Sequence, residues 1–518
     1  MRKFWPSRVA VACLLALMVP SSLRAQTKEP RVTEEKVRAV LPELERYIRD
    51  AQQKRGVPGV AVGVVYQDKV LYLKGFGVRE AGKTDLVTED TVFQIASLSK
   101  AVGSTVVAAL VSDGVVSWDA KITDLDPSFQ LREPYATSQL TIRDLYCHRS
   151  GLPGDAGNEL EELGYPREEI LRRLRYMPPA ASFRSTYAYS NFGLTEGGVA
   201  AAKAAGKSWE EVSKEKLYGP LGMTHTSSLN ADLLKETNVA KLHIKVDGKW
   251  TAKAVRQPDA QSPAGGVSST AKDLVRWLQL QIGKGKFDGR QLIKADVLLE
   301  THVPQMVSGT NMDTGIPSFY ALGWVTQYDA AGRTIWSHSG AFSDGARSIA
   351  TIYPMDELGI VVLANAFPSG ITEAVSATFF DLVHEGKPQR DHFTHFDLLV
   401  DSLFGPADRK AIQKYATPPA PVSSALGDSA YLGSYASNYL GAARVVAGKG
   451  GLVLQLGPGK MDHPLKHWNR DVFLWYPGSE SPAAPSPVTF TIGSDGRASR
   501  LYIEALDING QGTLERVP

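Results

Sequence analysis

Apolar and polar residues first alternate with a helical period and then in runs typical of strands. A helix is predicted from four apolar positions that share one face: Leu41, Leu44, Ile48 and Ala51. After the break at Gly56–Gly59, runs rich in β-branched and aromatic residues at 60–66 and 70–73 flank a polar turn. This part of the chain is therefore predicted to form a helix followed by a β-hairpin.

The next three hundred residues continue this division. From Ser97 the apolar positions recur at helical spacing as far as Leu110, and Gly114 is placed to end that helix. Strand character returns in three runs, at 334–336, 348–353 and 359–364. Strands at both ends with helices between them predict an α/β + α fold, in which helices and an all-α insertion flank an antiparallel sheet.

The pattern changes again beyond a Pro/Ala/Ser stretch at 416–421. Short strand-like runs, separated by turns, lie at 443–446, 452–456, 472–475, 488–492 and 501–503. They predict a small all-β sandwich or barrel. The expected boundaries are a first domain over 30–415, a linker over 416–426 and a β domain over 427–518.

The first 25 residues have the order of a secretory signal peptide. Arg2, Lys3 and Arg8 precede a short apolar run at 9–19, and the segment ends in the small residue Ala25. The run is too short to span a membrane, and a buried N-terminal helix is the alternative. The interpretation predicts an exported protein, periplasmic or secreted.

Charge and cysteine content limit the partners. Removal of residues 1–25 takes away four positive charges and moves the formal charge from +2 to −2, which gives no electrostatic case for nucleic acid. Only Cys147 of the two cysteines would remain, so no intrachain disulfide is expected. His392 and His395 are isolated histidines, so neither a metal nor another cofactor is predicted.

The tetrapeptide Ser-x-x-Lys, which puts a hydroxyl and an amine one helical turn apart, occurs at 97–100, 213–216 and 269–272. A lysine sheltered from water beside a serine can lose its proton and act as a base. The segment at 213 lies in a charged run typical of a solvated helix face, and the one at 269 is typical of a helix cap. Ser97 alone has apolar flanks, although a helix cap explains that serine equally well on this context.

Two further elements carry candidate chemistry. Tyr189 and Asn191 point to the same side of an extended stretch, where a phenol near an ammonium has a lowered pKa and an amide can hold a carbonyl. His338-Ser339-Gly340-Ala341 ends a strand, and its glycine would allow close approach of a substrate to the following backbone N–H. Each element has a structural explanation when it is taken alone.

Together, Ser97-x-x-Lys100, Tyr189-x-Asn191 and His338-Ser339-Gly340 resemble the motifs of the serine β-lactamase and penicillin-binding protein superfamily. The Tyr-x-Asn form is similar to the branch that holds class C β-lactamases, D-aminopeptidases, D-alanyl-D-alanine carboxypeptidases and esterases. The resemblance extends over roughly residues 32–382, and the C-terminal β module resembles lipocalin-like domains appended to some of these peptidases.

The resemblance implies a role for each motif residue. Ser97 would be the nucleophile, Lys100 and Tyr189 its activating and proton-shuttling pair, and His338 part of the opposite wall. The backbone N–H groups of Ser97 and Ala341 would form the oxyanion hole, while Asn191, Ser339 and Gly340 would contact the substrate. The residues alone do not decide whether the base is Lys100 or Tyr189, since their titrations are coupled.

One departure bears on the substrate. Class C β-lactamases have Lys-Thr-Gly as the third motif, and here His338 replaces the permanent cation, which favours peptidase, amidase or esterase chemistry on a small molecule or short peptide. The alternatives are a β-lactamase, or a sensor that binds penicillin or cell-wall peptides without turnover. The oligomeric state is left open.

Overall fold

The computed structural model describes residues 32–253, 255–311, 314–404, 406–477 and 484–518. The predicted signal peptide lies outside these residues. Within the described part, no helix is both long enough and apolar enough to cross a membrane.

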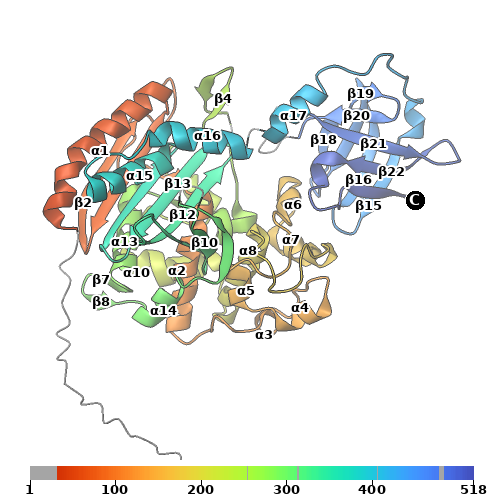
Figure 1. Ribbon diagram of the computed structural model, residues 1–518. Coiled ribbons are helices and arrows are strands. Elements are labelled where there is room, and N and C mark those ends of the chain that lie inside the picture. The colour runs from red at the N-terminus through yellow and green to blue at the C-terminus, as the bar shows by residue number, and fades with distance from the viewer. Residues whose placement is uncertain (1–31, 254, 312–313, 405, 478–483) are drawn as a thin grey trace, which may run out of the picture. The chain divides into compact units, whose positions relative to one another are not determined.

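An eight-stranded antiparallel sheet forms the centre of the first domain (Figure 1). Its order is β2-β1-β14-β13-β12-β11-β10-β9, so strands from both ends of the domain lie side by side. The strands are β1 (Gly59–Tyr66), β2 (Lys69–Gly77), β9 (Met306–Thr310), β10 (Pro317–Tyr320), β11 (Val325–Tyr328), β12 (Thr334–Phe342), β13 (Ala346–Tyr353) and β14 (Leu358–Ala364). The predicted antiparallel sheet is confirmed.

Alternate residues of β1 are buried on opposite faces of this sheet. Val62 and neighbours at even positions pack in one cluster with α1 (Glu34–Arg55) and α15 (Ile371–Glu385). Ala61 and Val65 belong to the cluster on the other side, which includes α13 (Ala271–Ile282). A strand covered on both faces reads as one continuous apolar run, which explains the sequence of β1.

The helical region connects β2 to β9 and contains two of the three predicted motifs, those of Ser97 and Tyr189, whereas the third lies on β12. Its longest members are α2 (Ser99–Ser112) and α8 (Asn191–Ala204). The shorter helices are α3 (Ile122–Leu125), α4 (Pro134–Gln139), α5 (Ile142–Tyr146), α6 (Asn158–Glu162), α7 (Arg167–Arg173), α9 (Trp209–Ser213), α10 (Gly219–Leu221), α11 (Asn230–Leu233), α12 (Ser262–Gly265) and α14 (Ala295–Glu300). Three two-stranded ribbons pair β3 (Phe93–Gln94) with β6 (Ser268–Ser269), β4 (Ile244–Val246) with β5 (Lys249–Thr251), and β7 (Lys286–Phe287) with β8 (Arg290–Gln291).

Two helices follow α15, namely α16 (His392–Phe404) and α17 (Pro406–Lys414), and the C-terminal region is all β. Its nine strands pair in the order β18-β17-β16-β15-β23-β22-β21-β20-β19. The strands are β15 (Gly433–Ser437), β16 (Gly441–Gly448), β17 (Gly451–Leu456), β18 (Met461–Pro464), β19 (Lys466–Asn469), β20 (Val472–Trp475), β21 (Ser486–Ile492), β22 (Ala498–Ile503) and β23 (Thr513–Val517). The two edge strands are separated in the chain by Leu465 alone, so the sheet curls into a nearly closed barrel, as predicted.

Candidate active site

Ser97 lies in a short 3-10 turn, η1 (Ala96–Leu98), that leads directly into α2. Ala96 has a left-handed backbone conformation with φ of 47°, which is uncommon for a residue with a side chain. The carbonyl of Ile95 accepts a hydrogen bond of 2.6 Å from Ser348 Oγ on β13. This bond anchors the turn to β13 of the sheet. Ser97 remains partly exposed and lines a cavity.

Strand β12 passes so close to this turn that residue 340 must be glycine. A Cβ at Gly340 would lie 2.2 Å from the Ile95 carbonyl oxygen and 2.9 Å from the Leu98 nitrogen, closer than packed atoms approach. Gly340 thus lies against the backbone of the serine turn. Its neighbours Ser339 and Ala341 line the cavity.

Lys100 is completely buried one turn beyond the serine, with 0% of its surface exposed. Its Nζ lies 2.7 Å from Asn191 Oδ1, 3.0 Å from the Ala264 carbonyl oxygen and 3.1 Å from Ser97 Oγ. Burial lowers the pKa of the amine well below its ordinary value of 10.5, and the negative charge of Asp155 opposes this shift.

The geometry fixes where the lone pair of a neutral Lys100 points. An uncharged amine has two N–H donors and one lone pair, while the amide oxygen of Asn191 and the carbonyl of Ala264 can only accept. Both N–H groups therefore donate to those oxygens, and the lone pair is left for the hydroxyl of Ser97. This is the arrangement that a base needs to remove the proton of a serine.

Tyr189 lines the same cavity, but the expectation of a lowered phenol pKa is wrong. Burial raises the pKa of Tyr189 well above 10, and the hydrogen bond with Ser97, which lowers it, does not compensate. A lowered phenol pKa requires a charged lysine beside the ring. Lys100 Nζ does lie 4.5 Å from the ring centroid, but burial disfavours its charge as well.

Asn191 also differs from expectation, because it is the first residue of α8 and not part of an extended stretch. The side chain of Ser190 caps this helix by accepting a 3.1 Å hydrogen bond from the Gly193 backbone N–H. The amide of Asn191 donates to Asn158 Oδ1 at 3.3 Å and accepts from Lys100. Its side chain therefore links α6, α8 and the buried amine.

His338 is buried in the opposite wall and held in one tautomer. Its Nδ1 lies 2.7 Å from the carbonyl of Ser339, which can only accept, so Nδ1 carries the proton. Nε2 lies 2.9 Å from the Tyr320 hydroxyl, which then donates to it. Burial lowers the pKa of His338 to about 3, so the ring is neutral where the family motif has a cation.

Two aromatic residues of this site were not predicted. Tyr320, at the end of β10, is 1% exposed and orients His338. His148 packs on Tyr189 with ring centroids 4.6 Å apart and accepts a 3.1 Å hydrogen bond from the Ser190 backbone N–H at Nδ1. Burial lowers the pKa of His148 well below its ordinary value. Both residues lie within the span of roughly residues 32–382 over which the family resemblance extends, but neither belongs to one of its three motifs.

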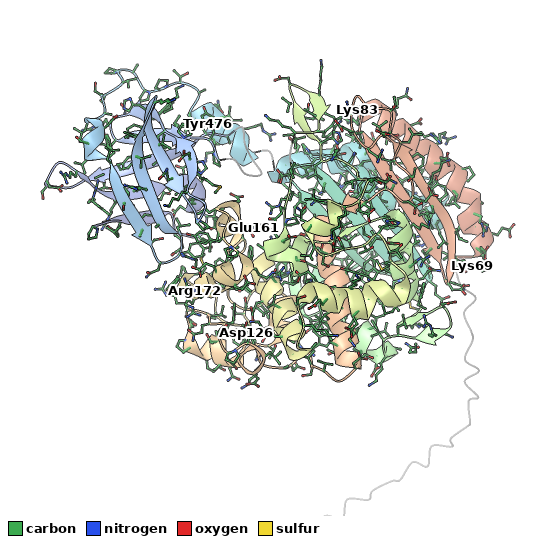
Figure 2. All side chains as sticks on the ribbon, turned by 180° about the vertical axis from the view of Figure 1, so that it is seen from behind. Lys69, Lys83, Asp126, Glu161, Arg172 and Tyr476 are labelled. Atoms are coloured by element: carbon green, nitrogen blue, oxygen red, sulfur yellow. The ribbon has the colours of Figure 1, made fainter. Side chains whose placement is uncertain are left out.

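These residues share one cavity of about 620 Å³, here called the active-site cavity. Its members from the predicted site are Ser97, Tyr189, Asn191, His338, Ser339 and Ala341. The two arginines that line it already have carboxylate partners in the same wall. Arg256 contacts Glu161 (labelled in Figure 2) at 2.6 Å, and Arg347 forms an ion pair with Glu373.

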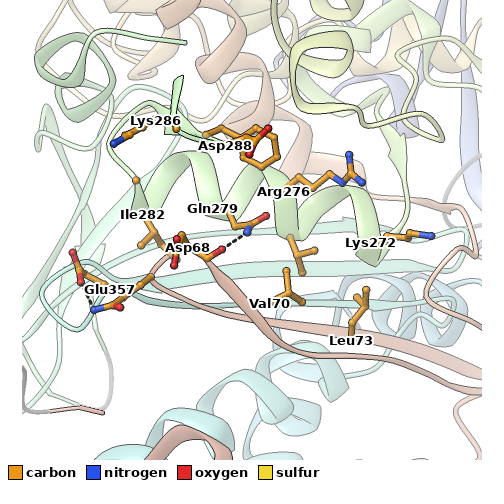
Figure 3. Close-up of a pocket in the computed structure, with 15 residues that line it drawn as sticks. Asp68, Val70, Leu73, Lys272, Arg276, Gln279, Ile282, Lys286, Asp288 and Glu357 are labelled. Carbon is orange, nitrogen blue, oxygen red and sulfur yellow. Dashed lines mark hydrogen bonds between the residues drawn. The ribbon is translucent and has the colours of Figure 1, made fainter. Parts of the chain in front are cut away.

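A larger cavity, of about 1010 Å³, lies between α13 and the β1–β2 hairpin (Figure 3). Val70, Leu73 and charged side chains such as Lys272 and Asp288 line it, and it shares no residue with the active-site cavity. It lacks the serine, amine and phenol on which the predicted chemistry depends. Among the described residues, no group of three or more His, Cys, Asp or Glu side chains could hold a metal ion.

Comparison with known proteins adds independent findings. A family model described as Beta-lactamase matches residues 44–379, and one described as Domain of unknown function (DUF3471) matches residues 417–515. The chain is 25% identical over 426 residues to Beta-lactamase-like protein 2 of Dictyostelium discoideum, covering 80% of this chain and 74% of that protein. It is 29% identical over 329 residues to Unguisins hydrolase ungD' of Aspergillus campestris, covering 60% and 58%.

A similar fold occurs in a solved structure, the octameric penicillin-binding protein homologue from Pyrococcus abyssi. The TM-score is 0.59 at 20% sequence identity, with 92% of this chain and 99% of that chain covered.

Proposed function

Because the chain belongs to the beta-lactamase family, whose model covers more than half of its length, we propose that it hydrolyses small amides, peptides or esters through an acyl-enzyme on Ser97. Family membership confirms the resemblance seen in the three motifs. The observation that carries the proposal is the buried amine of Lys100, 3.1 Å from Ser97 Oγ, with both N–H groups committed to other oxygens.

Lys100 is the base in this proposal. Its lone pair accepts the hydroxyl proton as Ser97 Oγ bonds to the substrate carbonyl carbon, and the carbonyl electrons move onto oxygen. The backbone N–H groups of Ser97 and Ala341 stabilise that oxyanion. Collapse of the intermediate expels the leaving group, which takes a proton from Lys100 through the neutral phenol of Tyr189. Water then attacks the acyl carbon and gives a proton to Lys100 through Tyr189. The bond from Ser97 Oγ to the acyl carbon breaks, the acid product leaves, and Oγ takes a proton back from Lys100.

The neutral wall around His338 supports an ester or amide substrate over a β-lactam. A β-lactam or peptide carboxylate is best held by a permanent cation, and the ring of His338 is uncharged. Arg256 and Arg347 are already paired with glutamates, so a second carboxylate would have to displace one of them. The chain is similar to a protein named as a hydrolase, Unguisins hydrolase ungD', and this supports hydrolysis of a substrate over binding without turnover.

A panel of p-nitrophenyl esters, D-amino acid amides and a chromogenic cephalosporin tests the proposal. We expect hydrolysis of an ester or amide, with kcat/KM at least about 10³-fold lower in Ser97→Ala. If the cephalosporin were hydrolysed fastest, the protein would instead be a β-lactamase. If an acyl adduct formed and never decayed, the protein would be a sensor without turnover.

We further infer that the protein is exported, because residues 1–25 have the charged, apolar and small-residue order of a signal peptide. The first residue of the mature protein is then Gln26. N-terminal sequencing of the protein from its native host tests this. Recovery of chains that still begin with residues 1–25 would contradict it.

A further inference from the structure

The active-site cavity has both polar and apolar lining residues. Asp155, Glu161, Glu162 and Arg256 are among the polar ones. Four side chains from α16 are among the apolar ones: Phe396, Leu399, Val400 and Leu403. The catalytic Ser97 and this helix therefore border one continuous space.

The four α16 residues form a regular stripe. Their spacing of three, four and seven residues places them on one face of the helix. Leu399 is 39% exposed and Leu403 is 66% exposed, although both line the cavity. Large apolar side chains left open to water inside a binding cavity are typical of sites that bury an apolar part of a ligand.

The helix is fixed to the first domain by contacts near its N-terminal half. Asp397 Oδ1 accepts a 2.8 Å hydrogen bond from the Gly370 backbone N–H, and His392 Nε2 lies 2.6 Å from Asp381 Oδ2 on α15. The guanidinium of Arg55 lies 5.3 Å from the ring centroid of Phe393. Figure 1 shows α16 beside α15, and the segment falls between the two family models, which end at 379 and begin at 417.

From this arrangement we propose that α16 is a specificity element, which binds an extended apolar group of the substrate while its carbonyl is attacked by Ser97. The inference rests on the proposed function and deepens it. The preferred substrates are esters or amides that carry an aliphatic chain or a large apolar side chain. Burial of that group against Leu399 and Leu403 supplies binding free energy that a short substrate cannot obtain.

Leu398 provides a matched control. It is 66% exposed, the same fraction as Leu403, and belongs to the same helix, but it is not among the residues that line the cavity. The variants Leu403→Asn and Leu398→Asn make the same chemical change at equal exposure. Only the first alters the cavity.

The test measures kcat/KM of p-nitrophenyl acetate and octanoate for the full chain and both variants. We expect the wild-type protein to prefer octanoate, and Leu403→Asn to lower kcat/KM for octanoate about tenfold, mainly through KM, with acetate unchanged. Leu398→Asn should leave both esters unchanged. Equal preference of the wild-type protein for both esters, or equal effects of the two variants, would overturn the inference.

A binding experiment separates this inference from the proposed function. Octanamide is titrated calorimetrically into Ser97→Ala, with and without Leu403→Asn. Binding that weakens about tenfold with the second substitution supports the apolar site even if no ester is hydrolysed. Binding that is unaffected by Leu403→Asn overturns the site, whether or not Ser97-dependent hydrolysis has been observed.

Discussion

Three segments of this molecule contain the same Ser-x-x-Lys tetrapeptide and place its lysine in different environments. Lys100 is fully buried and contacts three neutral oxygens. Lys216 is 28% exposed and pairs with Asp113 at 3.0 Å, and Lys272 is 48% exposed and pairs with Asp90 at 2.9 Å. The hydrogen bonds to these aspartates raise the pKa of both exposed lysines.

The same Ser-x-x-Lys spacing therefore holds a lysine whose charge is disfavoured in one segment and lysines whose charge is stabilised in the two others. Burial among neutral oxygens removes the advantage of the charged form of Lys100, whereas a carboxylate partner increases it for Lys216 and Lys272. The tetrapeptide alone sets neither the contact between serine and amine nor the protonation state of the lysine, since only Lys100 contacts its own serine among the three. The environment decides its protonation.

The largest effect is expected from removing the buried amine. Lys100→Met keeps the approximate volume and removes the base, so kcat/KM should fall about 10³-fold or more. Lys216→Met makes the same change at an exposed pair and should alter kcat/KM by less than about twofold. Comparable losses of kcat/KM in Lys100→Met and Lys216→Met would show that burial does not distinguish Lys100 from Lys216.

Displacement of the serine turn should have the next largest effect. The Cβ of Gly340→Ala would meet the Ile95 carbonyl, so the turn must shift, and kcat/KM is expected to fall about 10- to 100-fold. Gly450→Ala is the control, because a Cβ there meets nothing within 4 Å. Ester hydrolysis by both variants, with circular dichroism to verify folding, measures the difference. Full activity of Gly340→Ala would contradict the close packing of β12 on η1.

The pH dependence of the reaction reports the state of Lys100 directly. Protonation removes its lone pair, so kcat/KM should fall about tenfold per pH unit below the pKa of the amine. Because burial lowers that pKa, the fall should begin well below the ordinary lysine value of 10.5. Rate profiles for the wild-type protein and Lys216→Met should coincide. An acid limb that begins near 10.5 would mean that Lys100 is an ordinary cation.

The smallest effect is expected at the serine of the second tetrapeptide. Ser213 is buried and donates a 2.8 Å hydrogen bond to the carbonyl of Trp209. Ser213→Ala should lower the free energy of unfolding by about 1 kcal/mol and leave ester hydrolysis unchanged. Denaturant unfolding and the rate of hydrolysis are the two measurements. If Ser213→Ala lost activity but kept its stability, Ser213 would take part in the reaction, which contradicts the assignment of the chemistry to Ser97.

Much of the architecture could be predicted because local patterns matched the final structure. The apolar run of β1 and the apolar face of α1 report burial on both sides of the sheet. The charged residues Glu211, Lys214 and Glu215 are exposed, as expected of a solvated face. Ser213 does not lie on that face, because it is buried together with Val212 and Leu217. A charged run can belong to a half-buried helix.

The electrostatics of the site could not be read from the sequence. Whether Tyr189 or Lys100 holds a charge depends on how deeply each is buried. This is set by residues distant in the chain, since Ala264 accepts a hydrogen bond from Lys100 and the ring of Tyr320 lies 6.2 Å from that of Tyr189. Tyr320 belongs to no motif, and it contacts His338 because β10 and β12 both lie next to β11 in the sheet. A contact that depends on the order of strands in a sheet cannot be predicted from local sequence patterns.

Mass spectrometry can identify the residue that is acylated and so decide whether Ser97 is the nucleophile. The protein is treated with an activated ester, digested, and its labelled peptide sequenced at several times. We expect one adduct, on Ser97, that decays with turnover, forms about 10³-fold more slowly in Lys100→Met, and is absent in Ser97→Ala. An adduct on Ser213 or Ser269, or labelling of Lys100→Met at the wild-type rate, would contradict it.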